Sequence, residues 1–157
     1  MLLTRLLFFL PLLSVHGGPD PLMSWRLSSA ELHDSKLSAR LGPDPQVSGA
    51  PLAAPGPGGG SLMFDGIDDR MVVAEDINEL GAFLPKRHFT ISTWFSVNTP
   101  RNFGGVFSAV QDNGDSEQGI VLGYDAKSFY IGLATKGADD GNGLLTYLRS
   151  TTSYEIG

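Results

Sequence analysis

Residues 105–134 read GVFSAVQDNGDSEQGIVLGYDAKSFYIGLA and carry the clearest strand pattern in the chain. Three apolar runs, at 105–110, 118–124 and 128–134, are rich in β-branched and aromatic residues. Between them lie Asp112-Asn113-Gly114-Asp115 and Asp125-Ala126-Lys127, which are turn-forming sequences. Short apolar runs separated by such turns are typical of consecutive antiparallel strands. We therefore predict three strands joined by tight turns.

Further strands are predicted on both sides of this region. One follows at 144–150, and two short ones precede it at 62–64 and 71–74. The strongest alternation lies at 88–97, where one side of the predicted strand carries Phe89, Ile91, Thr93 and Phe95. Trp94 lies on the other side, and we expect it to pack in the core of a two-sheet sandwich. The spacing predicts an all-β fold, an antiparallel β-sandwich of the jelly-roll type.

The N-terminal residues have the pattern of an export signal. Arg5 precedes ten mostly apolar residues at 6–15, and the small residues Gly17 and Gly18 follow soon after. This pattern predicts a secretory signal peptide over residues 1–17 and a secreted, extracellular protein. The apolar run is too short to cross a hydrocarbon core about 30 Å thick, so no membrane span is expected.

Residues 18–60 read as a low-complexity leader. A capping-box pattern at 28–31 favours a short helix with two leucines, which is too little to hold a helix in water. From residue 41 the composition turns to Gly, Pro, Ala and Ser, ending in APGPGGG. Such a segment buries too little apolar surface to offset its ordering entropy. We expect a disordered spacer, followed by one domain at 61–157.

The charge of this chain of 157 residues argues against nucleic-acid binding, and its composition excludes disulfides. It has 11 Lys and Arg against 17 Asp and Glu, a net charge of −6, and its cations are scattered singly. Nucleic-acid binding needs clustered cations, so no nucleic-acid partner is expected. The chain has no Cys, so its core must form without disulfides.

Two motifs carry a resemblance to a known family. Residues 61–73 read SLMFDGIDDRMVV, and residues 89–95 read FTISTWF. In this order, followed by GGVFS at 104–108 and GIVLG at 119–123, they resemble the opening strands of laminin-G-like, concanavalin-A-like jelly-roll domains. The arrangement is also similar to the N-terminal region of pappalysin-type secreted metalloproteinases. The resemblance implies an extracellular module that binds glycan or protein.

The chain departs from this family at its C-terminal end. In the family, a segment like SYEIG at 153–157 leads into a strand of Trp-His-hydrophobic-Ala character, which this sequence does not contain. Without the later strands, sheet edges would be unpaired and an apolar face uncovered. We expect the jelly roll to be incomplete, as the N-terminal part of a larger protein.

Two acidic loops are candidate calcium sites, because Ca²⁺ prefers hard oxygen ligands from flexible loops. One loop contains Asp112, Asn113 and Asp115, and the other contains Asp139 and Asp140. Neither has the EF-hand spacing, and Asp and Asn are also ordinary turn residues, so plain turns are the favoured interpretation. The same interpretation is favoured for the acidic residues of the first motif, Asp65, Asp68 and Asp69.

No catalytic constellation is evident in the sequence, so we predict that this chain is not an enzyme. Concanavalin-A-like glucanases resemble one another in a strand motif with paired carboxylates, which act across the sugar. The nearest pattern here joins Glu75, Asp76 and Glu79, but the Asp stands in the wrong place and the context predicts a loop or helical turn. His88 stands alone before a predicted strand, and no Ser-His-Asp set can be drawn around it.

Aromatic residues supply the remaining candidates for ligand binding. Tyr130 and Tyr147 are predicted on an exposed concave face, and Trp94 is an alternative stacking residue. The sequence thus predicts a secreted, non-catalytic recognition module for glycan or extracellular protein, with calcium as a candidate cofactor. The alternative is an accessory domain of a secreted hydrolase, a metalloproteinase or phosphoesterase, whose catalytic domain lies beyond residue 157.

Overall fold

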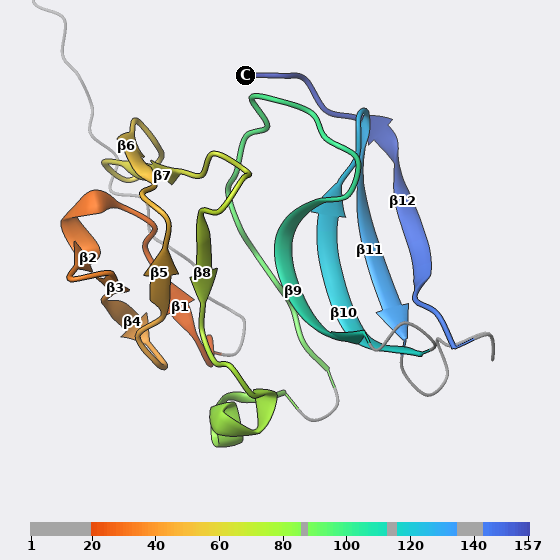
Figure 1. Ribbon diagram of the computed structural model, residues 1–157, viewed down its shortest axis with the longest axis horizontal. Coiled ribbons are helices and arrows are strands. Elements are labelled where there is room, and N and C mark those ends of the chain that lie inside the picture. The colour runs from red at the N-terminus through yellow and green to blue at the C-terminus, as the bar shows by residue number, and fades with distance from the viewer. Residues whose placement is uncertain (1–19, 86–87, 113–115, 135–142) are drawn as a thin grey trace, which may run out of the picture.

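The computed structural model describes residues 20–85, 88–112, 116–134 and 143–157. Figure 1 shows the strands in two groups, with the short strands β1 to β8 on the left and the curved sheet β9 to β12 on the right. The segment before β9 runs between the two groups. All strand pairs among the described residues are antiparallel. The chain is therefore all-β with antiparallel sheets, as the sequence predicts.

The larger sheet confirms the four C-terminal strands predicted from sequence. Its strands are β9 (Gly104–Asp112), β10 (Glu117–Tyr124), β11 (Ser128–Ala134) and β12 (Thr146–Ser153). They pair in the order β12-β11-β10-β9, so β9 and β12 form the two edges. Consecutive strands are neighbours, with a turn of three residues between β10 and β11 and a longer connection, 135–145, between β11 and β12.

The N-terminal group consists of short strands in three small sheets. Its elements are β1 (Ser24–Trp25), β2 (Leu32–His33), β3 (Lys36–Leu37), β4 (Ala39–Leu41), β5 (Gln46–Ser48), β6 (Leu52–Ala54), β7 (Ser61–Met63) and β8 (Arg70–Val72). The sheets have the orders β2-β3-β5-β8, β6-β7 and β1-β4. The predicted strands near 62–64 and 71–74 thus exist as β7 and β8, but they pair with β6 and β5 and not with each other.

The expectation of a disordered leader is wrong for the described residues 20–60. A small core of Leu37, Val47 and Leu62 joins this segment to the start of the predicted domain. Leu37 is fully buried and Val47 is 4% exposed. Apolar side chains packed against these three are Trp25, Leu27, Leu32, Phe64 and Met71. The average composition of the leader hides these single apolar positions, which become buried only together with residues of β7 and β8.

Polar side chains order the Gly/Pro-rich turns of the same segment. The Trp25 indole N–H donates to the Pro43 carbonyl at 2.9 Å. The Asp44 carboxylate accepts from the Ala39 N–H at 2.7 Å, and the Asp69 carboxylate accepts from the Ala50 N–H at 2.7 Å. These bonds satisfy backbone donors that short strands leave without partners. The turns are therefore fixed by specific contacts that composition does not report.

The strand predicted at 88–97 does not form a ladder with any described strand. Residues 88–97 have no strand assignment, although they lie between β8 and β9 (Figure 1). The prediction that Trp94 packs in the core is also wrong, because its side chain is 85% exposed. Strand propensity reports how well a side chain fits a pleated, half-buried surface, and here no neighbouring strand supplies that surface.

The part of the chain from residue 88 to the start of β9 nevertheless connects the two groups of strands. The Phe95 ring lies edge-on to the ring of Phe129 in β11, with centroids 5.1 Å apart. The Asn98 amide donates to the Met63 sulfur at 3.7 Å, and the Arg101 guanidinium donates to the Asp65 carbonyl at 3.5 Å. The segment thus contacts β11 on one side and the region of β7 on the other.

In the part of the chain that the structure describes, helical structure is limited to two 3₁₀ elements, η1 (Ser29–Glu31) and η2 (Ile77–Phe83). Asp76 caps η2 by accepting the Asn78 N–H at 2.8 Å, so of the two alternatives predicted here, a loop or a helical turn, the structure has the helical turn. Among the described residues, no helix has the length and apolar character needed to cross a bilayer.

The packed N-terminal core generates a stability prediction. Leu37→Ala removes a fully buried side chain, so we expect the free energy of unfolding to fall by about 2–5 kcal/mol. Leu52→Ala is the matched control, because Leu52 is 62% exposed and its truncation should cost little. Urea denaturation followed by tryptophan fluorescence, to which Trp25 of this core contributes, measures both. Equal stability of the two variants would contradict a folded segment at 20–60.

Candidate binding surface

Three aromatic rings gather on one face of the larger sheet. Tyr130 of β11 and Tyr147 of β12 have ring centroids 5.6 Å apart, edge to face. Phe103, just before β9, lies 6.1 Å from Tyr130 and 6.3 Å from Tyr147. We call these three residues the aromatic surface. The structure therefore brings together the two tyrosines predicted from sequence and adds Phe103.

The three rings differ in exposure. Phe103 is 67% exposed and Tyr147 is 39% exposed, so both rings are open to a ligand. Tyr130 is only 4% exposed, so the expectation that its side chain is exposed is wrong. Burial raises the pKa of the Tyr130 hydroxyl, and its closeness to Tyr147 adds to this effect. Tyr130 is the buried support of the aromatic surface, while the other two rings form its outer part.

Glycines beneath the rings explain why the tyrosines lie where they do. A Cβ atom at Gly132 of β11 would stand 2.8 Å from Val121 Cγ1 and 2.9 Å from the Tyr147 ring. A Cβ atom at Gly123 of β10 would stand 2.6 Å from the Tyr130 ring. Contacts this short do not occur for real Cβ atoms, so only glycine leaves room for each ring.

Phe103 is held in an unusual backbone conformation. Its φ is +56°, in the left-handed region that bulky side chains rarely adopt. Such a strained backbone conformation persists only where surrounding contacts hold it, and it is found most often at active sites and ligand sites. The sequence signal, Asn102-Phe103-Gly104 before an apolar run, reads as an ordinary turn, so pattern analysis missed this residue.

A polar cluster borders the aromatic surface at the β10–β11 turn. Asp125 accepts hydrogen bonds from the backbone N–H groups of Lys127 at 3.0 Å and Ser128 at 2.9 Å, and from the Ser128 hydroxyl at 3.0 Å. Its other oxygen lies 3.5 Å from the Arg149 guanidinium. Arg149 in turn lies over the Tyr130 ring, 5.8 Å from its centroid, in a cation–π contact.

The same contacts set the protonation of Asp125. The backbone N–H groups of Lys127 and Ser128 hold the pKa of Asp125 below its usual value of 3.8. The Ser128 hydroxyl and the Arg149 charge act in the same direction, while desolvation opposes them. Asp125 is therefore a carboxylate at neutral pH and keeps its partners in place.

Two open pockets flank these residues and share Phe103. The first, about 410 Å³, is lined in part by Asn102, Asp125, Lys127 and Arg149, and we call it the rim pocket. The second, about 290 Å³, lies along the aromatic surface, and its other lining residues include Ser108, Val121 and Leu145. Glu117 fixes this end of the site, because its carboxylate accepts the Leu145 N–H at 2.6 Å.

The other aromatic candidate from sequence lies elsewhere. Trp94 neighbours Phe95, whose ring contacts Phe129. Side chains alternate along β11, so Phe129 and Tyr130 project from opposite faces of the sheet. The structure therefore does not join Trp94 to the aromatic surface, and any stacking role of its exposed ring stays a prediction.

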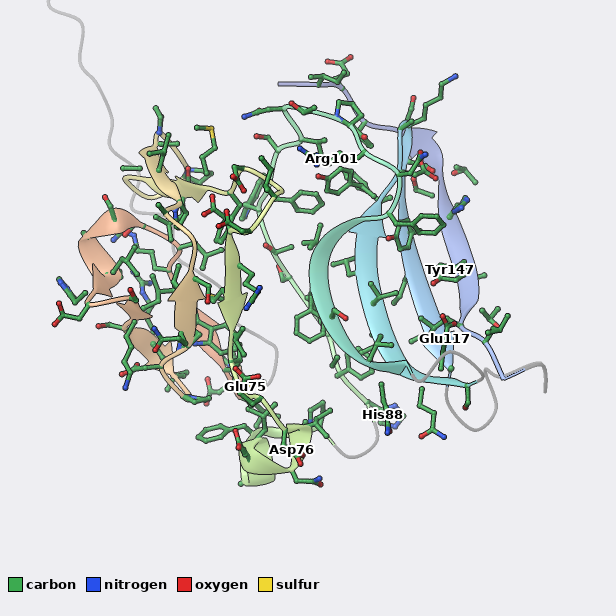
Figure 2. All side chains as sticks on the ribbon, in the orientation of Figure 1. Glu75, Asp76, His88, Arg101, Glu117 and Tyr147 are labelled. Carbon is green, nitrogen blue, oxygen red and sulfur yellow. The ribbon has the colours of Figure 1, made fainter. Side chains whose placement is uncertain are left out.

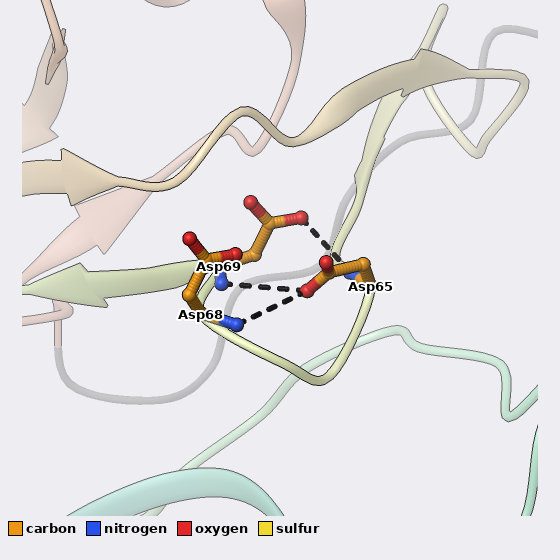
Figure 3. A group of neighbouring side chains, drawn as sticks. All are labelled: Asp65, Asp68 and Asp69. Atoms are coloured by element: carbon orange, nitrogen blue, oxygen red, sulfur yellow. Dashed lines mark hydrogen bonds between the residues drawn. The ribbon is translucent and has the colours of Figure 1, made fainter.

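The acidic residues of the first motif form a loop held together by its own backbone (Figure 3). Asp65 accepts the N–H groups of Ile67 at 2.7 Å and Asp68 at 3.3 Å, and Asp69 accepts the Asp65 N–H at 2.9 Å. The hydrogen bond from Ile67 is the main cause that lowers the pKa of Asp65. One oxygen from each of the three carboxylates lies within 4.8 Å of the others, but the carboxylates of Asp65 and Asp69 already accept backbone N–H groups.

The calcium candidates predicted from sequence are not tested by the structure. Asn113, Asp115, Asp139 and Asp140 lie outside the described residues. Asp112 ends β9, opposite Glu117, and its side chain is also outside the description. A calcium site in these loops stays a prediction.

The polar residues weighed for catalysis are dispersed, as Figure 2 shows. Glu75 and Asp76 lie at the start of η2, below β8, and Glu79 lies within η2. His88 is exposed and lies apart from η2. Because Asp76 caps η2, its carboxylate already has a structural role.

Comparisons with known proteins identify no relative. No family model matches the chain, and no curated protein or solved structure matches it significantly. The resemblance to laminin-G-like domains is thus neither supported nor contradicted, and function must be argued from the surface itself.

The close contact between Gly132 and Tyr147 generates a prediction. In Gly132→Ala, the new methyl group must displace the Tyr147 ring or the Val121 side chain, so we expect a loss of stability of about 1–3 kcal/mol. Gly105→Ala is the matched control in the same sheet, because no atom lies within 4 Å of the Cβ position there. Thermal unfolding compares the two. Equal melting temperatures would show that the ring does not lie over Gly132.

Asp125 generates a prediction about pH. Its folded-state pKa is lowered, so its stabilising contribution is present above pH 3.8 and is lost as the pH falls through the folded-state value. Below about pH 4 we expect the urea concentration at the unfolding midpoint to decrease as the pH decreases. The decrease should be less steep in Asp125→Asn, which has no carboxylate to protonate at this position. Urea titrations from neutral to acidic pH measure both slopes. Identical slopes would show that Asp125 does not contribute.

Proposed function

We propose that the chain is a non-catalytic recognition module of a secreted protein, which binds an extracellular protein ligand through the aromatic surface. The observation that carries the proposal is a pair of exposed rings, Phe103 and Tyr147, held against the buried ring of Tyr130. A rigid support means that little conformational entropy is lost when a ligand covers the outer rings.

The composition of the surface favours a protein ligand. Tyr and Arg are enriched at the centres of protein interfaces, where aromatic anchors pack beside charged groups. Tyr147 and Arg149 are such a pair on β12, and the neighbouring Leu148 is 61% exposed. Two open pockets beside the rings give room for the side chains of a partner.

The geometry of the rings is less suited to a sugar. A pyranose ring stacks best on a flat and open ring face. The planes of Phe103 and Tyr147 instead meet at 67°, and those of Tyr130 and Tyr147 meet at 71°. A glycan ligand is therefore an outcome of the test below and not part of the proposal.

The laminin-G-like jelly roll and export from the cell belong to the same proposal. Support for the jelly roll comes from the antiparallel sheet of β9 to β12, in which the motifs at 104–108 and 119–123 lie on the adjacent strands β9 and β10. Support for export comes from the sequence of residues 1–17, which lie outside the described residues. An accessory role beside a hydrolase domain stays a prediction.

The proposal is tested by selection from a random peptide library displayed on phage, with the full chain immobilised. We expect peptides enriched on the wild-type chain to be retained at least about tenfold less by Phe103→Ser/Tyr147→Ser, because interface anchors typically contribute 2 kcal/mol or more. Trp94→Ser is the matched control, because it removes an exposed ring from another part of the chain. Thermal unfolding confirms that both variants fold.

Three results would overturn this proposal. Peptides that the double variant retains as well as the wild-type chain would exclude the aromatic surface. Peptides lost only in Trp94→Ser would move the site to residues 88–97. Retention of the chain on a panel of immobilised glycans, with no peptide enriched, would assign the surface to carbohydrate.

A further inference from the structure

The two faces of the larger sheet differ in chemistry. Side chains alternate between the faces along each strand, so directly paired residues of neighbouring strands share a face. One row of paired residues is apolar throughout and consists of Phe107, Leu122, Ile131 and Leu148. The next row, on the face of the aromatic surface, consists of Ser108, Val121, Gly132 and Tyr147. Antiparallel sheets commonly pack one face on the core and leave the other to solvent. Further strands of the domain would therefore cover the apolar face, which leaves the face of the aromatic surface open to a ligand.

The smaller of the two open pockets lies on this open face, along the aromatic surface, and we call it the sheet groove. Its volume is about 290 Å³. The exposed rings of Phe103 and Tyr147 line it together with three aliphatic side chains, Val110, Val121 and Leu145. Apolar walls of this kind suit the alkyl stem of a long side chain, whose polar end then lies at the border of the groove.

Glu117 gives the sheet groove a negative charge. Among the described residues that line the groove, it is the one that carries a charge. Its carboxylate accepts the Leu145 N–H at 2.6 Å, which holds the group in place. A carboxylate has about four acceptor sites on its two oxygens, so this bond leaves capacity for further donors. The groove therefore favours a cationic side chain over an anionic one.

Glu117 and the ring of Tyr147 lie within reach of a single side chain. Leu145, whose N–H binds Glu117, precedes Tyr147 by two residues, which is about 7 Å along an extended chain. Figure 2 shows Glu117 and Tyr147 in the same part of the larger sheet, and both line the groove. A guanidinium is planar, donates five N–H groups and stacks on aromatic rings, so it can bind the carboxylate and contact the ring together.

The same sheet already binds one guanidinium in this way. Arg149 lies over the Tyr130 ring, 5.8 Å from its centroid, and its guanidinium lies 3.5 Å from the Asp125 carboxylate. Because Asp125 offsets the charge of Arg149, repulsion between Arg149 and a second cation is reduced. The net charge of the whole chain, −6, also attracts a cationic ligand.

We propose that an arginine side chain of the protein ligand occupies the sheet groove, an inference that rests on the recognition function proposed above. Its alkyl stem packs against Val121 and Leu145. Its guanidinium pairs with the Glu117 carboxylate and lies with its flat face against the Tyr147 ring. Lysine fits less well, because an ammonium group does not stack and binds a carboxylate as a point charge.

The probe is a synthetic peptide with blocked ends that contains one Arg among Gly and Ser residues, and its affinity for the full chain is measured by NMR titration. The matched peptide replaces Arg by citrulline, which has the same shape without the charge. We expect the Arg peptide to bind about fivefold more tightly, as an exposed charge pair with a ring contact allows. The amide signal of Leu145 should shift on binding, because its N–H is bonded to Glu117.

Two variants with the same change of charge test the position of the guanidinium. Glu117→Gln removes the charge of the groove but keeps an acceptor for the Leu145 N–H, so the preference for Arg over citrulline should disappear. Glu79→Gln is the matched control, because it removes one negative charge from an exposed residue of η2 that does not line the groove. The preference should persist in this variant. Thermal unfolding checks that both variants fold.

The outcomes separate failure of this inference from failure of the proposed function. Equal binding of the Arg and citrulline peptides would overturn the inference. An equal loss of preference in Glu117→Gln and Glu79→Gln would also overturn it, because long-range attraction alone would then explain the preference. In either case the proposed function would still stand if selected phage peptides depend on Phe103 and Tyr147. Absence of any peptide ligand in both experiments would overturn both proposals.

Discussion

The carboxylate of Asp125 is the contact on which the larger sheet and its binding surface depend. One oxygen accepts the backbone N–H groups that close the turn between β10 and β11. The other oxygen pairs with Arg149 of β12, and the Asp125 carbonyl accepts the hydroxyl of Tyr154. One residue thus links three strands and the segment after them. Because Arg149 lies over Tyr130, the same contact orients the charge that borders the aromatic surface.

The surface above this turn suits binding better than chemistry. Its rings touch one another edge to face, and the carboxylates nearest to them, Asp125 and Glu117, are committed to backbone donors. A carboxylate that acts as a general acid or base near neutral pH needs a raised pKa and a substrate within hydrogen-bond reach. The pKa of Asp125 is instead lowered, which keeps it ionised and structural. The exposed rings of Phe103 and Tyr147 instead offer a ligand an apolar contact surface.

The sequence predicts the strands of the larger sheet well, because each is an apolar run bounded by turn-forming residues and consecutive strands pair with one another. The N-terminal group was missed because its core consists of single residues, Leu37, Val47 and Leu62, separated by Gly/Pro-rich turns. The strand at 88–97 was predicted from alternation alone, which says nothing about whether a partner strand exists. Tyr130 and Tyr147 were predicted as aromatic residues on two separate strands, and the pairing of these strands brings the two rings together. Phe103 precedes its strand, so no periodicity marks it.

The pairing of β5 with β8 has a consequence for the order of folding. The β10–β11 hairpin needs only a three-residue turn, held by Asp125, so its contacts are local and form quickly. Leu37 and Val47 instead become buried only when they pack with Leu62 and Met71, which are synthesised later. A chain that has emerged only as far as residue 60 lacks the surface that would cover its own leucine and valine. We therefore expect the segment 20–60 to stay disordered during synthesis, as its composition indicates, and to fold once β7 and β8 have been synthesised.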